Sequence, residues 1–555
     1  MPQSFSIRPA LGSIAVCGLV TVWIMLTANT TLLTRVPDYF GGWTFPAIGF
    51  VVGLSLILLA VLVSLSARWT AKPALVFFLI VAASASWFTD KYGVIIDRGM
   101  IQNTLETNPD EAGQFLTGPF IFHMVLFGLL PSIGVAVIRI RHRPWRQKLL
   151  HNSAVIFPAL GIFTAITFIF FQTYASMLRN HRDLPMTFTP LSPIVKTVDY
   201  FQRQSRMRGL KVQPLGTDAR KSIDTNVGQS PKVLVLMVGE TARAQNFSLN
   251  GYERETDPRM KTAQVVNFPD VSSCGTATNV SLPCMFSIYG RADYTEFKGR
   301  SSEHLLDVLQ HAGFKTTWID NNITDKRLGQ TSEFERTSNV DDPRFCKDGE
   351  CRDGILVDRL QKRLSTIKED TVIVLHMNGS HGPAYYRRYP ESHRKFRPDC
   401  RTDDFSSCSV EEIVNAYDNT ILYTDQVIGD VIDILKQDRD KVASAMLFIS
   451  DHGESLGENG LFLHAAPYFM APEFQTRVPM MLWAGDEFLQ RESIEPTCLQ
   501  KAASNTLSHD NLFHSVLGLL NVSTSVRSDD LDIFSRCRKS GGTLAGRENY
   551  AANGG

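Results

Sequence analysis

The sequence predicts a chain of two parts, a membrane domain of five α-helices followed by an α/β domain with a mostly parallel sheet. Five long apolar segments fill the first third of the 555 residues, which are too many for one hydrophobic core. From Pro231 onward, strand-like runs alternate with helical stretches such as Ser302–Ala312 and Glu411–Lys436, and this alternation favours a layered α/β fold. Three strand-like runs end in side chains that can bind a metal, at the edge where open α/β sheets bind ligands.

Each apolar segment is close to the roughly 20 residues that a helix needs to cross a bilayer. One such segment could be a buried core helix, but five in succession favour a membrane domain at residues 1–175. The first segment is too long to be only the apolar core of a cleavable signal. The segments are Leu11–Leu33, Phe45–Ala67, Pro73–Ile96, Gly118–Ile138 and Ser153–Ala175.

Charges in the connecting links predict the orientation of this domain. The links between segments two and three and between four and five are basic, so the positive-inside rule places both in the cytoplasm. The link between segments three and four is acidic and is expected outside. Five crossings that start inside leave the rest of the chain outside, which in a bacterium is the periplasm. We therefore expect a multi-pass membrane protein, which in a bacterium would lie in the inner membrane with a periplasmic domain.

A polar, basic stretch at residues 176–230 joins the two parts. It predicts either an amphipathic segment on the membrane surface or a solvated linker. We assign residues 231–540 to the external domain, and residues 541–555, which are rich in Gly, Asn and Ala, to a flexible tail. The 56 basic and 56 acidic residues give no net charge, so no nucleic-acid partner is expected.

Eight of the nine cysteines lie in the proposed external part, as expected for disulfides in an oxidising compartment. Zinc fingers are the competing interpretation, but the chain has no Cys-x2-Cys pair. The simplest connectivity joins near neighbours and leaves Cys498 and Cys537 over. These local pairs are Cys274–Cys284, Cys346–Cys351 and Cys400–Cys408.

Acidic and imidazole side chains follow three of the predicted strands. Each one alone could be a capping or turn residue, but the carboxyl ends of parallel strands meet at one edge of a sheet. Glu, Asp and His are good zinc ligands, so their joint placement predicts a shared zinc site. The runs are Val233–Val238 before Glu240, Val372–Leu375 before His381, and Ala445–Ile449 before Asp451 and His452.

A loop of small residues between Cys274 and Cys284 holds two threonines, Thr276 and Thr278. A disulfide between these cysteines would fix the loop and aim one hydroxyl. A threonine hydroxyl is a weak nucleophile, but coordination to zinc lowers its pKa. This arrangement predicts phosphoryl or sulfuryl transfer through a covalent enzyme intermediate. The alternative for both threonines is ordinary hydrogen bonding within a turn.

Two histidines are further candidates for contact with the substrate. His381 follows the second strand, and His464 follows a glycine-rich stretch after the Asp-His pair. Imidazoles at these positions could hold phosphate oxygens, protonate a leaving alkoxide or bind a second zinc. For the remaining candidates, His304, His311, His393 and His509, we expect surface or core roles.

Taken together, five motifs resemble those of the lipid A phosphoethanolamine transferases, a family that includes the mobile colistin-resistance enzymes. The similarity runs over nearly the whole chain, including the five apolar segments. The motifs are Gly239–Arg243, Asn246–Tyr252, Cys274–Thr278, His381–Pro383 and Ser450–Gly460.

The resemblance implies an alkaline-phosphatase/sulfatase-like external domain and roles for several of the motif residues. It implies that Thr278 is the nucleophile and also completes a zinc shell with Glu240, Asp451 and His452. It implies that His381 and His464 bind the phosphoethanolamine group or a second zinc. Further substrate contacts are implied for Asn103, Thr107, Glu111 and Lys326. Lys326 follows an Asp-Asn pair, Asp320-Asn321, and family members often carry a serine soon after this pair, where this chain has Ile323 and Thr324.

The implied reaction moves phosphoethanolamine from phosphatidylethanolamine to a lipid A phosphate through a phosphothreonine-type intermediate, and it would confer resistance to polymyxin. Alternative acceptors are the lipopolysaccharide core or a periplasmic glucan. A membrane-anchored phosphatase or sulfatase is a further alternative, although the loop lacks the Cys/Ser-x-Pro-x-Arg element of sulfatases. A non-catalytic transporter or sensor fits less well, because the spans carry no charged pathway. We expect a monomer.

Overall fold

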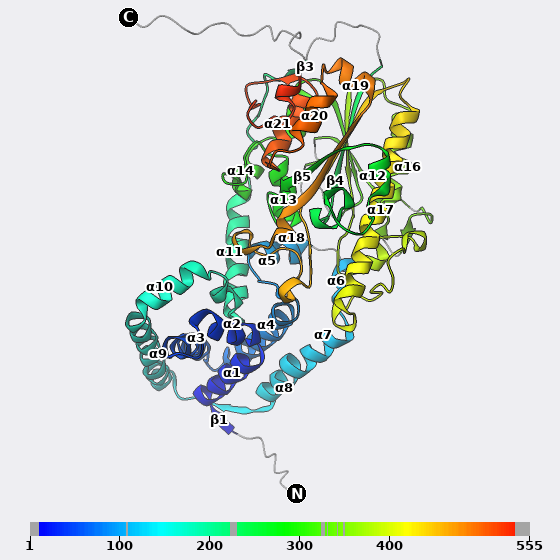
Figure 1. Cartoon of the computed structure of the whole chain (residues 1–555). Helices are drawn as coiled ribbons and strands as arrows, with labels where there is room; N and C mark the ends of the chain where they lie inside the picture. Colours follow the sequence, from blue (N-terminus) through cyan, green and yellow to red (C-terminus); the bar gives the residue numbers. More distant parts are fainter. Residues whose placement is uncertain are drawn as a thin grey trace, which may run out of the picture. The chain divides into compact units, whose positions relative to one another are not determined.

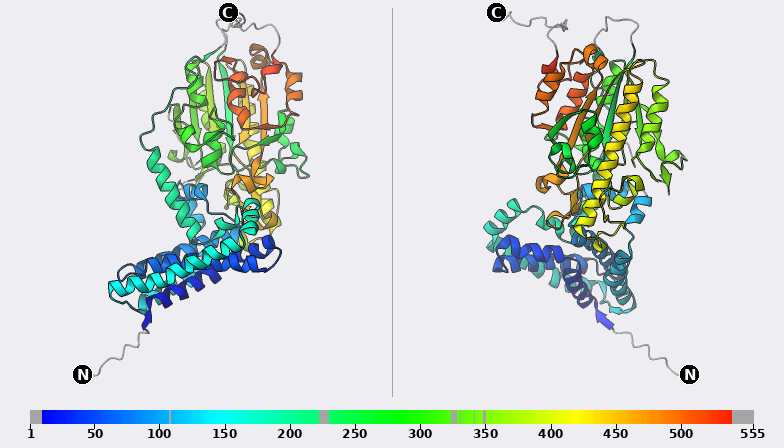
Figure 2. Two further views of the ribbon diagram at one scale, coloured as in Figure 1. Left: turned by 90° about the vertical axis from the view of Figure 1, so that its left-hand side faces the viewer. Right: turned by 45° about the vertical axis from the view of Figure 1, so that its right-hand side comes forward.

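The computed structural model describes residues 10–106, 109–221, 230–322, 328–329, 331–340, 342–347 and 350–538 (Figures 1 and 2). The described residues form two compact units. The first holds the residues up to Arg208 together with Ser455–Met470, and the second holds Gly209–Glu454 and the residues from Ala471 onward.

Four helical stretches of the first unit are long and apolar enough to cross a membrane, and a bent pair makes a fifth candidate. One of the four consists of α7 (Gly118–His123), a π-helical turn (Met124–Leu129) and α8 (Leu130–Val137). The others are α3 (Phe45–Ser64), α4 (Ala71–Tyr92) and α9 (Trp145–Ile169). These stretches confirm the apolar segments as helices, with differences in the first and the fifth. The fifth predicted segment, Ser153–Ala175, runs past the end of α9, and a separate helix begins at Phe171.

The first apolar segment is not one straight helix. It forms α1 (Ser13–Thr27) and α2 (Thr30–Phe40), which are bent by 68° at the break between them. The side chain of Asn29 lies at this break, where it donates to the carbonyl oxygens of Ile24 and Thr189 at 3.1 and 2.9 Å. It also accepts from the amide of Thr189 at 2.9 Å. Such side-chain bonds to the backbone compete with helix continuation.

The basic stretch after the last span is partly helical. It takes in the second half of α10 (Phe171–Asn180) and all of α11 (Leu191–Met207). One side of α11 exposes Val195, Val198 and Phe201, so an amphipathic segment at a membrane surface remains our prediction for it. The other short elements of this unit are β1 (Ala10–Gly12), β2 (Arg139–Arg141), α5 (Arg98–Glu106), α6 (Pro109–Gln114), β12 (Ser455–Leu456) and β13 (Phe462–Leu463).

An eight-stranded sheet forms the centre of the second unit, in the order β15-β5-β14-β11-β4-β10-β6-β7. The strand β14 runs antiparallel to both of its neighbours, and the other pairs are parallel, which confirms a mostly parallel sheet. The strands are β4 (Lys232–Gly239), β5 (Val266–Ser272), β6 (Lys315–Asp320), β7 (Glu333–Arg336), β10 (Thr371–His376), β11 (Ala443–Ser450), β14 (Arg477–Ala484) and β15 (Leu507–Ser508).

The central strands β4, β10 and β11 are buried along their whole lengths, because helices cover both faces of the sheet. Strands covered on both faces are apolar throughout instead of alternating. Helices α12, α16 and α17 lie on one side of the sheet, and α13, α20 and α21 lie on the other (Figure 1). These helices are α12 (Pro258–Thr262), α13 (Thr278–Met285), α16 (Gly354–Leu364), α17 (Val410–Gln437), α20 (Pro496–Ala502) and α21 (Asp510–Leu519).

Local sequence signals explain where the longest helix starts. A capping box begins α17: the Ser409 side chain accepts from the amide of Glu412, and the Glu412 side chain accepts from the amide of Ser409. The smaller elements of this unit are β3 (Arg220–Lys221), β8 (Cys346–Lys347), β9 (Glu350–Cys351), β16 (Val522–Ser523), α14 (Glu296–Arg300), α15 (Leu305–His311), α18 (Glu473–Thr476) and α19 (Asp486–Arg491).

Four disulfides hold the second unit together. The three local pairs are confirmed, namely Cys274–Cys284, Cys346–Cys351 and Cys400–Cys408. The two cysteines left over, Cys498 and Cys537, pair with each other across 39 residues of sequence. The ninth cysteine, Cys17, is a buried free thiol in α1.

A buried ion pair between Lys232 and Glu492 supports the start of β4. The two charged groups are 2.8 Å apart, and their side chains are only 5% and 1% exposed. We expect Lys232→Ala to lower the free energy of unfolding by about 3–5 kcal/mol, because it leaves a buried carboxylate without its counter-ion. Thermal unfolding of the full chain in detergent would measure the loss. The double variant Lys232→Met/Glu492→Leu should recover most of it, and an equally unstable double variant would contradict this account.

Candidate metal centre and active site

Three parallel strands deliver the central residues of the site to one edge of the sheet. In the register of β11 with β4, Ser450 lies opposite Gly239, and in that of β10 with β4, His376 lies opposite Val238. The residues that follow these strands therefore emerge next to one another. This is the placement that the sequence predicted for Glu240 and the Asp451-His452 pair.

Glu240, Asp451 and His452 form a buried cluster. Each offers one ligand atom, and these atoms all lie within 4.8 Å of one another. The Nε2 atom of His452 is 3.3 Å from Oε1 of Glu240 and 3.4 Å from Oδ2 of Asp451. All three side chains are inaccessible to solvent, so the cluster is a closed set of metal-ligand atoms in a site of low dielectric.

Thr278 is the first residue of α13, and its hydroxyl reaches this cluster. Its Oγ1 atom lies 3.1 and 3.0 Å from the two carboxylate oxygens of Glu240, to which it can donate. The same atom is 3.3 Å from Nε2 of His452. The Cys274–Cys284 disulfide ties the preceding loop to the body of this short helix. The geometry thus supports Thr278 as the candidate nucleophile.

The three ionisable groups of the cluster shift one another's pKa values. Burial opposes ionisation of Glu240, but the hydrogen bond and positive charge of His452 outweigh it and hold the pKa of Glu240 well below its usual value. Burial, with the negative charge of Glu240, raises the pKa of Asp451. Burial also disfavours the His452 imidazolium, but Asp451 and Glu240 raise its pKa. Two buried carboxylates are stable side by side only if a positive charge between them offsets their repulsion and their loss of hydration.

The donor set fits a zinc ion. Zinc is bound by combinations of His nitrogen and Asp or Glu oxygen atoms, and a catalytic site keeps a further position for a reacting group. The buried Oδ2 atom of Asp451 receives no hydrogen bond from the described part of the chain. A divalent cation would satisfy this oxygen and supply the positive charge that the cluster needs.

Several residues that the sequence did not single out orient the ligands. Asn322 donates to Oε2 of Glu240 at 2.8 Å, and Thr241 donates from its hydroxyl to Oε1 at 2.6 Å. The amide of Thr241 also donates to Oδ1 of Asp451 at 3.1 Å. Asn322 follows the parallel strand β6, so the rule that identified Glu240 could have identified it as well.

His509 also supports the site, from within the core. Its Nδ1 atom accepts from the amide of Cys274 at 3.1 Å, so the proton sits on Nε2, which lies 2.9 Å from the carbonyl oxygen of Ser450. Burial lowers the pKa of His509 to about 3, so the ring is neutral. The neutral imidazole links the threonine loop to the strand that carries Asp451. This agrees with the core role that we expected.

The other predicted residues are distributed over both units. His381 is buried in the loop after β10, and its positive charge contributes to lowering the pKa of Glu240. His464 lies in Ser455–Met470, which belongs to the first unit, as does Asn103 in α5. Thr107 and Lys326 fall outside the described residues, and so does the side chain of Glu111 in α6.

Comparisons with known proteins agree with this architecture. Residues 232–522 match the family model described as Sulfatase, and residues 54–205 match the model described as Phosphoethanolamine transferase EptA/EptB. The fold and site thus define a membrane-embedded enzyme with a sulfatase-type α/β domain.

Relatives that match over most of their length identify the family of the chain. Phosphoethanolamine transferase EptA of Escherichia coli K12 is 38% identical over 491 residues, which are 88% of this chain and 89% of the relative. Phosphatidylethanolamine transferase Mcr-1 of Escherichia coli is 33% identical, over 95% of this chain and 98% of the relative. The solved structure of the integral membrane protein lipooligosaccharide phosphoethanolamine transferase A of Neisseria meningitidis has a TM-score of 0.91 and 34% identity, and the match covers 96% of this chain and 100% of that one.

The chain therefore belongs to the EptA family of phosphoethanolamine transferases. It is a multi-pass protein of the bacterial inner membrane, and its catalytic domain lies in the periplasm. The oxidising periplasm accounts for the four disulfides of that domain.

Proposed function

We propose that this protein transfers phosphoethanolamine from phosphatidylethanolamine to a phosphate of lipid A, and that Thr278 carries the group between the two lipids. The observation that carries the proposal is the Thr278 hydroxyl, which lies 3.0 and 3.1 Å from the carboxylate oxygens of Glu240 in a buried cluster of ligand atoms. The relative Mcr-1 is named for phosphatidylethanolamine, which supports the donor, and the Neisseria enzyme is named for lipooligosaccharide, which supports the acceptor.

Glu240, Asp451, His452 and Thr278 would hold zinc in this mechanism. Bound zinc lowers the pKa of an oxygen ligand and offsets negative charge on a phosphoryl group. Asn322 and Thr241 keep the carboxylate of Glu240 oriented through their hydrogen bonds. Such partners of the ligands help to set metal affinity.

In the first step, Oγ1 of Thr278 attacks the phosphorus of phosphatidylethanolamine, and the bond between phosphorus and the diacylglycerol oxygen breaks. The hydroxyl of Thr278 can donate to Glu240, so the carboxylate of Glu240 can accept the hydroxyl proton during the attack. The leaving alkoxide takes up a proton and departs as diacylglycerol. We propose His381 and His464 to hold the phosphate oxygens or to protonate this alkoxide.

In the second step, a phosphate oxygen of lipid A attacks the phosphorus on Thr278. The bond between that phosphorus and Oγ1 breaks, and the threonine hydroxyl is restored. We propose Asn103, Thr107, Glu111 and Lys326 as further substrate contacts. The added ethanolamine cation would reduce the negative surface charge that attracts cationic peptides such as polymyxin, which would give resistance.

Expression of the chain in a strain without such enzymes tests the proposal. Mass spectrometry should show lipid A species heavier by one phosphoethanolamine group. Unmodified lipid A together with a modified core or glucan would establish one of the alternative acceptors. Release of free phosphoethanolamine with no modified acceptor would identify a hydrolase instead.

A further inference from the structure

A cavity of about 430 Å³ opens in the second unit beside the loop that follows β10. It is lined by Phe345 and Lys347, by residues 350–353 next to the Cys346–Cys351 disulfide, by Asn378 and Gly379, and by residues 386–389 together with Arg401. Its volume is in the range that small-molecule and cofactor sites occupy. The mechanism above uses none of its side chains.

The lining of this cavity is basic. Five cationic side chains face two carboxylates, and both carboxylates already have partners. Glu350 accepts from Arg388 at 2.9 Å, and Asp353 accepts from the amides of Asn378 and Gly379 at 2.8 Å. The cations are Lys347, Arg352, Arg387, Arg388 and Arg401. The cavity therefore carries a net positive charge of three.

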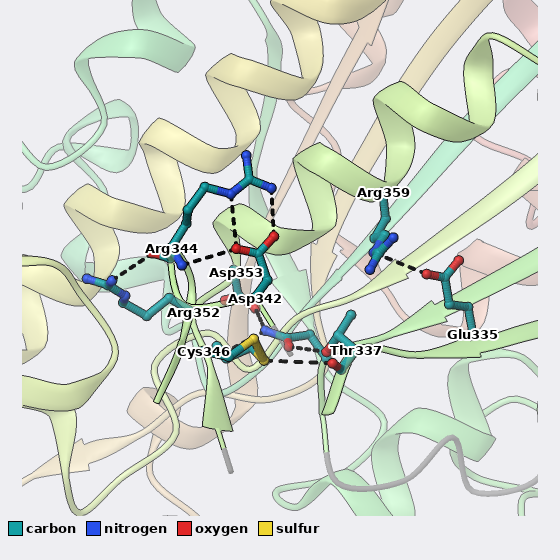
Figure 3. The surroundings of a disulfide bond; sticks show 10 residues. Glu335, Thr337, Asp342, Arg344, Cys346, Arg352, Asp353 and Arg359 are labelled. Atoms are coloured by element: carbon teal, nitrogen blue, oxygen red, sulfur yellow. Dashed lines mark hydrogen bonds and ion pairs between the residues drawn. A yellow bond between two sulfur atoms is a disulfide. The ribbon is translucent and has the colours of Figure 1, made fainter. Parts of the chain in front are cut away.

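Four of the five cations keep donors for a ligand. Among the residues that the structure describes, the side chain of Lys347 makes no hydrogen bond or ion pair, and the side chain of Arg352 makes one hydrogen bond, to the carbonyl oxygen of Arg344 (Figure 3). Arg387 has a long ion pair of 3.5 Å to Asp403. Arg401 has long ion pairs as well, of 3.4 Å to Glu391 and 3.6 Å to Asp399.

The ring of Tyr386 holds two of these cations at the same rim. The guanidinium carbons of Arg387 and Arg401 lie 5.6 and 5.7 Å from the centre of the ring, within the range of cation–π attraction. Two guanidinium groups that share one aromatic ring repel each other. An anion bound between them would remove this repulsion, and the planar fork of arginine matches phosphate oxygens.

The cavity also adjoins the metal-ligand cluster. Gly379 lines the cavity, and an added Cβ at this residue would lie 2.5 Å from the carbonyl oxygen of Glu240. The cation at the inner wall, Arg388, donates from Nε to the carbonyl oxygen of His381 at 2.9 Å. The wall of the cavity thus contacts the backbone of Glu240 and of His381.

We propose that this cavity binds the phosphorylated sugar of the acceptor lipid through Arg387 and Arg401. The inference rests on the proposed transfer to a lipid A phosphate, and it names a site for the acceptor. The donor fits the cavity poorly, because its head group carries an ammonium that a net positive lining repels. A phosphosugar is anionic and carries hydroxyls that the polar lining can bind.

Kinetics of the purified full chain in detergent provide the first test, with the variants Arg387→Ala, Arg401→Ala and Arg401→Lys. We expect each alanine variant to raise the KM for lipid A roughly tenfold, as for the loss of one charge-assisted hydrogen bond. Release of diacylglycerol from fluorescent phosphatidylethanolamine without acceptor should be unchanged. The KM of Arg401→Lys should lie between the values for the wild type and Arg401→Ala, because lysine keeps the positive charge but lacks the two parallel N–H donors of arginine.

Arg344→Ala is the matched control, because it removes a cation from the same region that does not line the cavity. It should leave the KM for lipid A unchanged. An unchanged KM in the Arg387 and Arg401 variants would overturn the proposal. A parallel loss of diacylglycerol release in those variants would also overturn it, because it would show a general structural role.

Direct binding separates this inference from the transfer reaction. Titration calorimetry of full-length Thr278→Ala with EDTA present should detect binding of glucosamine 1-phosphate and no binding of glucosamine. Arg387→Ala/Arg401→Ala in the same background should weaken binding at least roughly tenfold. Equal binding by both proteins, or equal affinity for inorganic phosphate and the sugar phosphate, would overturn the proposal. Arginine-dependent binding by a wild-type chain that modifies no lipid A would refute the proposed function and leave the cavity as an anion site.

Discussion

Thr278→Ala is expected to reduce phosphoethanolamine transfer by at least about 10³-fold while the protein stays folded in the membrane. The variant removes the oxygen that we propose to carry the phosphoryl group, and loss of a covalent nucleophile typically costs this much or more. The Thr278 hydroxyl contacts Glu240 and His452 at the rim of a preformed cluster, so its removal should leave the ligands in place. Lipid A mass spectrometry and diacylglycerol release would measure both half-reactions.

Two neighbouring variants sharpen this test. Thr278→Ser keeps a hydroxyl and should retain part of the activity, while Thr276→Ala should retain most of it. Undiminished transfer by Thr278→Ala would remove this residue as the nucleophile. If Thr276→Ala were then inactive, the covalent role would pass to Thr276.

Glu240→Gln is expected to abolish both the proposed zinc binding and the transfer activity. The change keeps the size of the side chain but removes one of the two negative charges that would balance the charge of a bound metal ion. We expect zinc affinity to fall by at least about 100-fold, since the loss of an outer-shell partner alone costs roughly 10–100-fold. Elemental analysis of the purified full chain would measure bound zinc against protein. Activity of the wild type should disappear with EDTA and return with added zinc, and the variant should not recover.

Stability gives a second readout of the same change. A ligand at 100 times its Kd stabilises a folded protein by about 2.7 kcal/mol, so zinc should raise the melting temperature of the wild type and not that of Glu240→Gln. Asp270→Asn is a suitable control, because this carboxylate pairs with Arg477 and does not belong to the cluster. Full zinc content and full activity in Glu240→Gln would exclude the proposed metal centre.

Much of the site was predictable because parallel strands align their carboxyl ends. The apolar runs of β4 and β11 lead directly into Glu240 and Asp451, and a buried parallel sheet leaves few other ways to arrange them. His509 could not be found this way. It contacts the site from the start of α21, and its partners Cys274 and Ser450 are 235 and 59 residues distant in sequence.

The bend in the first apolar segment shows a second reason why prediction from sequence was incomplete. Hydropathy alone favours a continuous span there, because every residue near the break except Asn29 suits a membrane helix or its end. The bend forms where Asn29 bonds to the backbone of Thr189, 160 residues later. A distant partner of this kind leaves no periodic signal in a local window of sequence.

Short stretches of sequence were enough to specify the elements whose cause is local: the apolar helices, the buried strands, the residues at the strand ends and the disulfides between near neighbours. Which distant groups meet was settled by the folded chain alone. Folding pairs Cys498 with Cys537 and gathers Arg352, Arg387 and Arg401 around one cavity. Each of those cations looks like an ordinary solvated charge along the chain. Electrostatic attraction acts through space, so their common role becomes visible only once folding has brought them together.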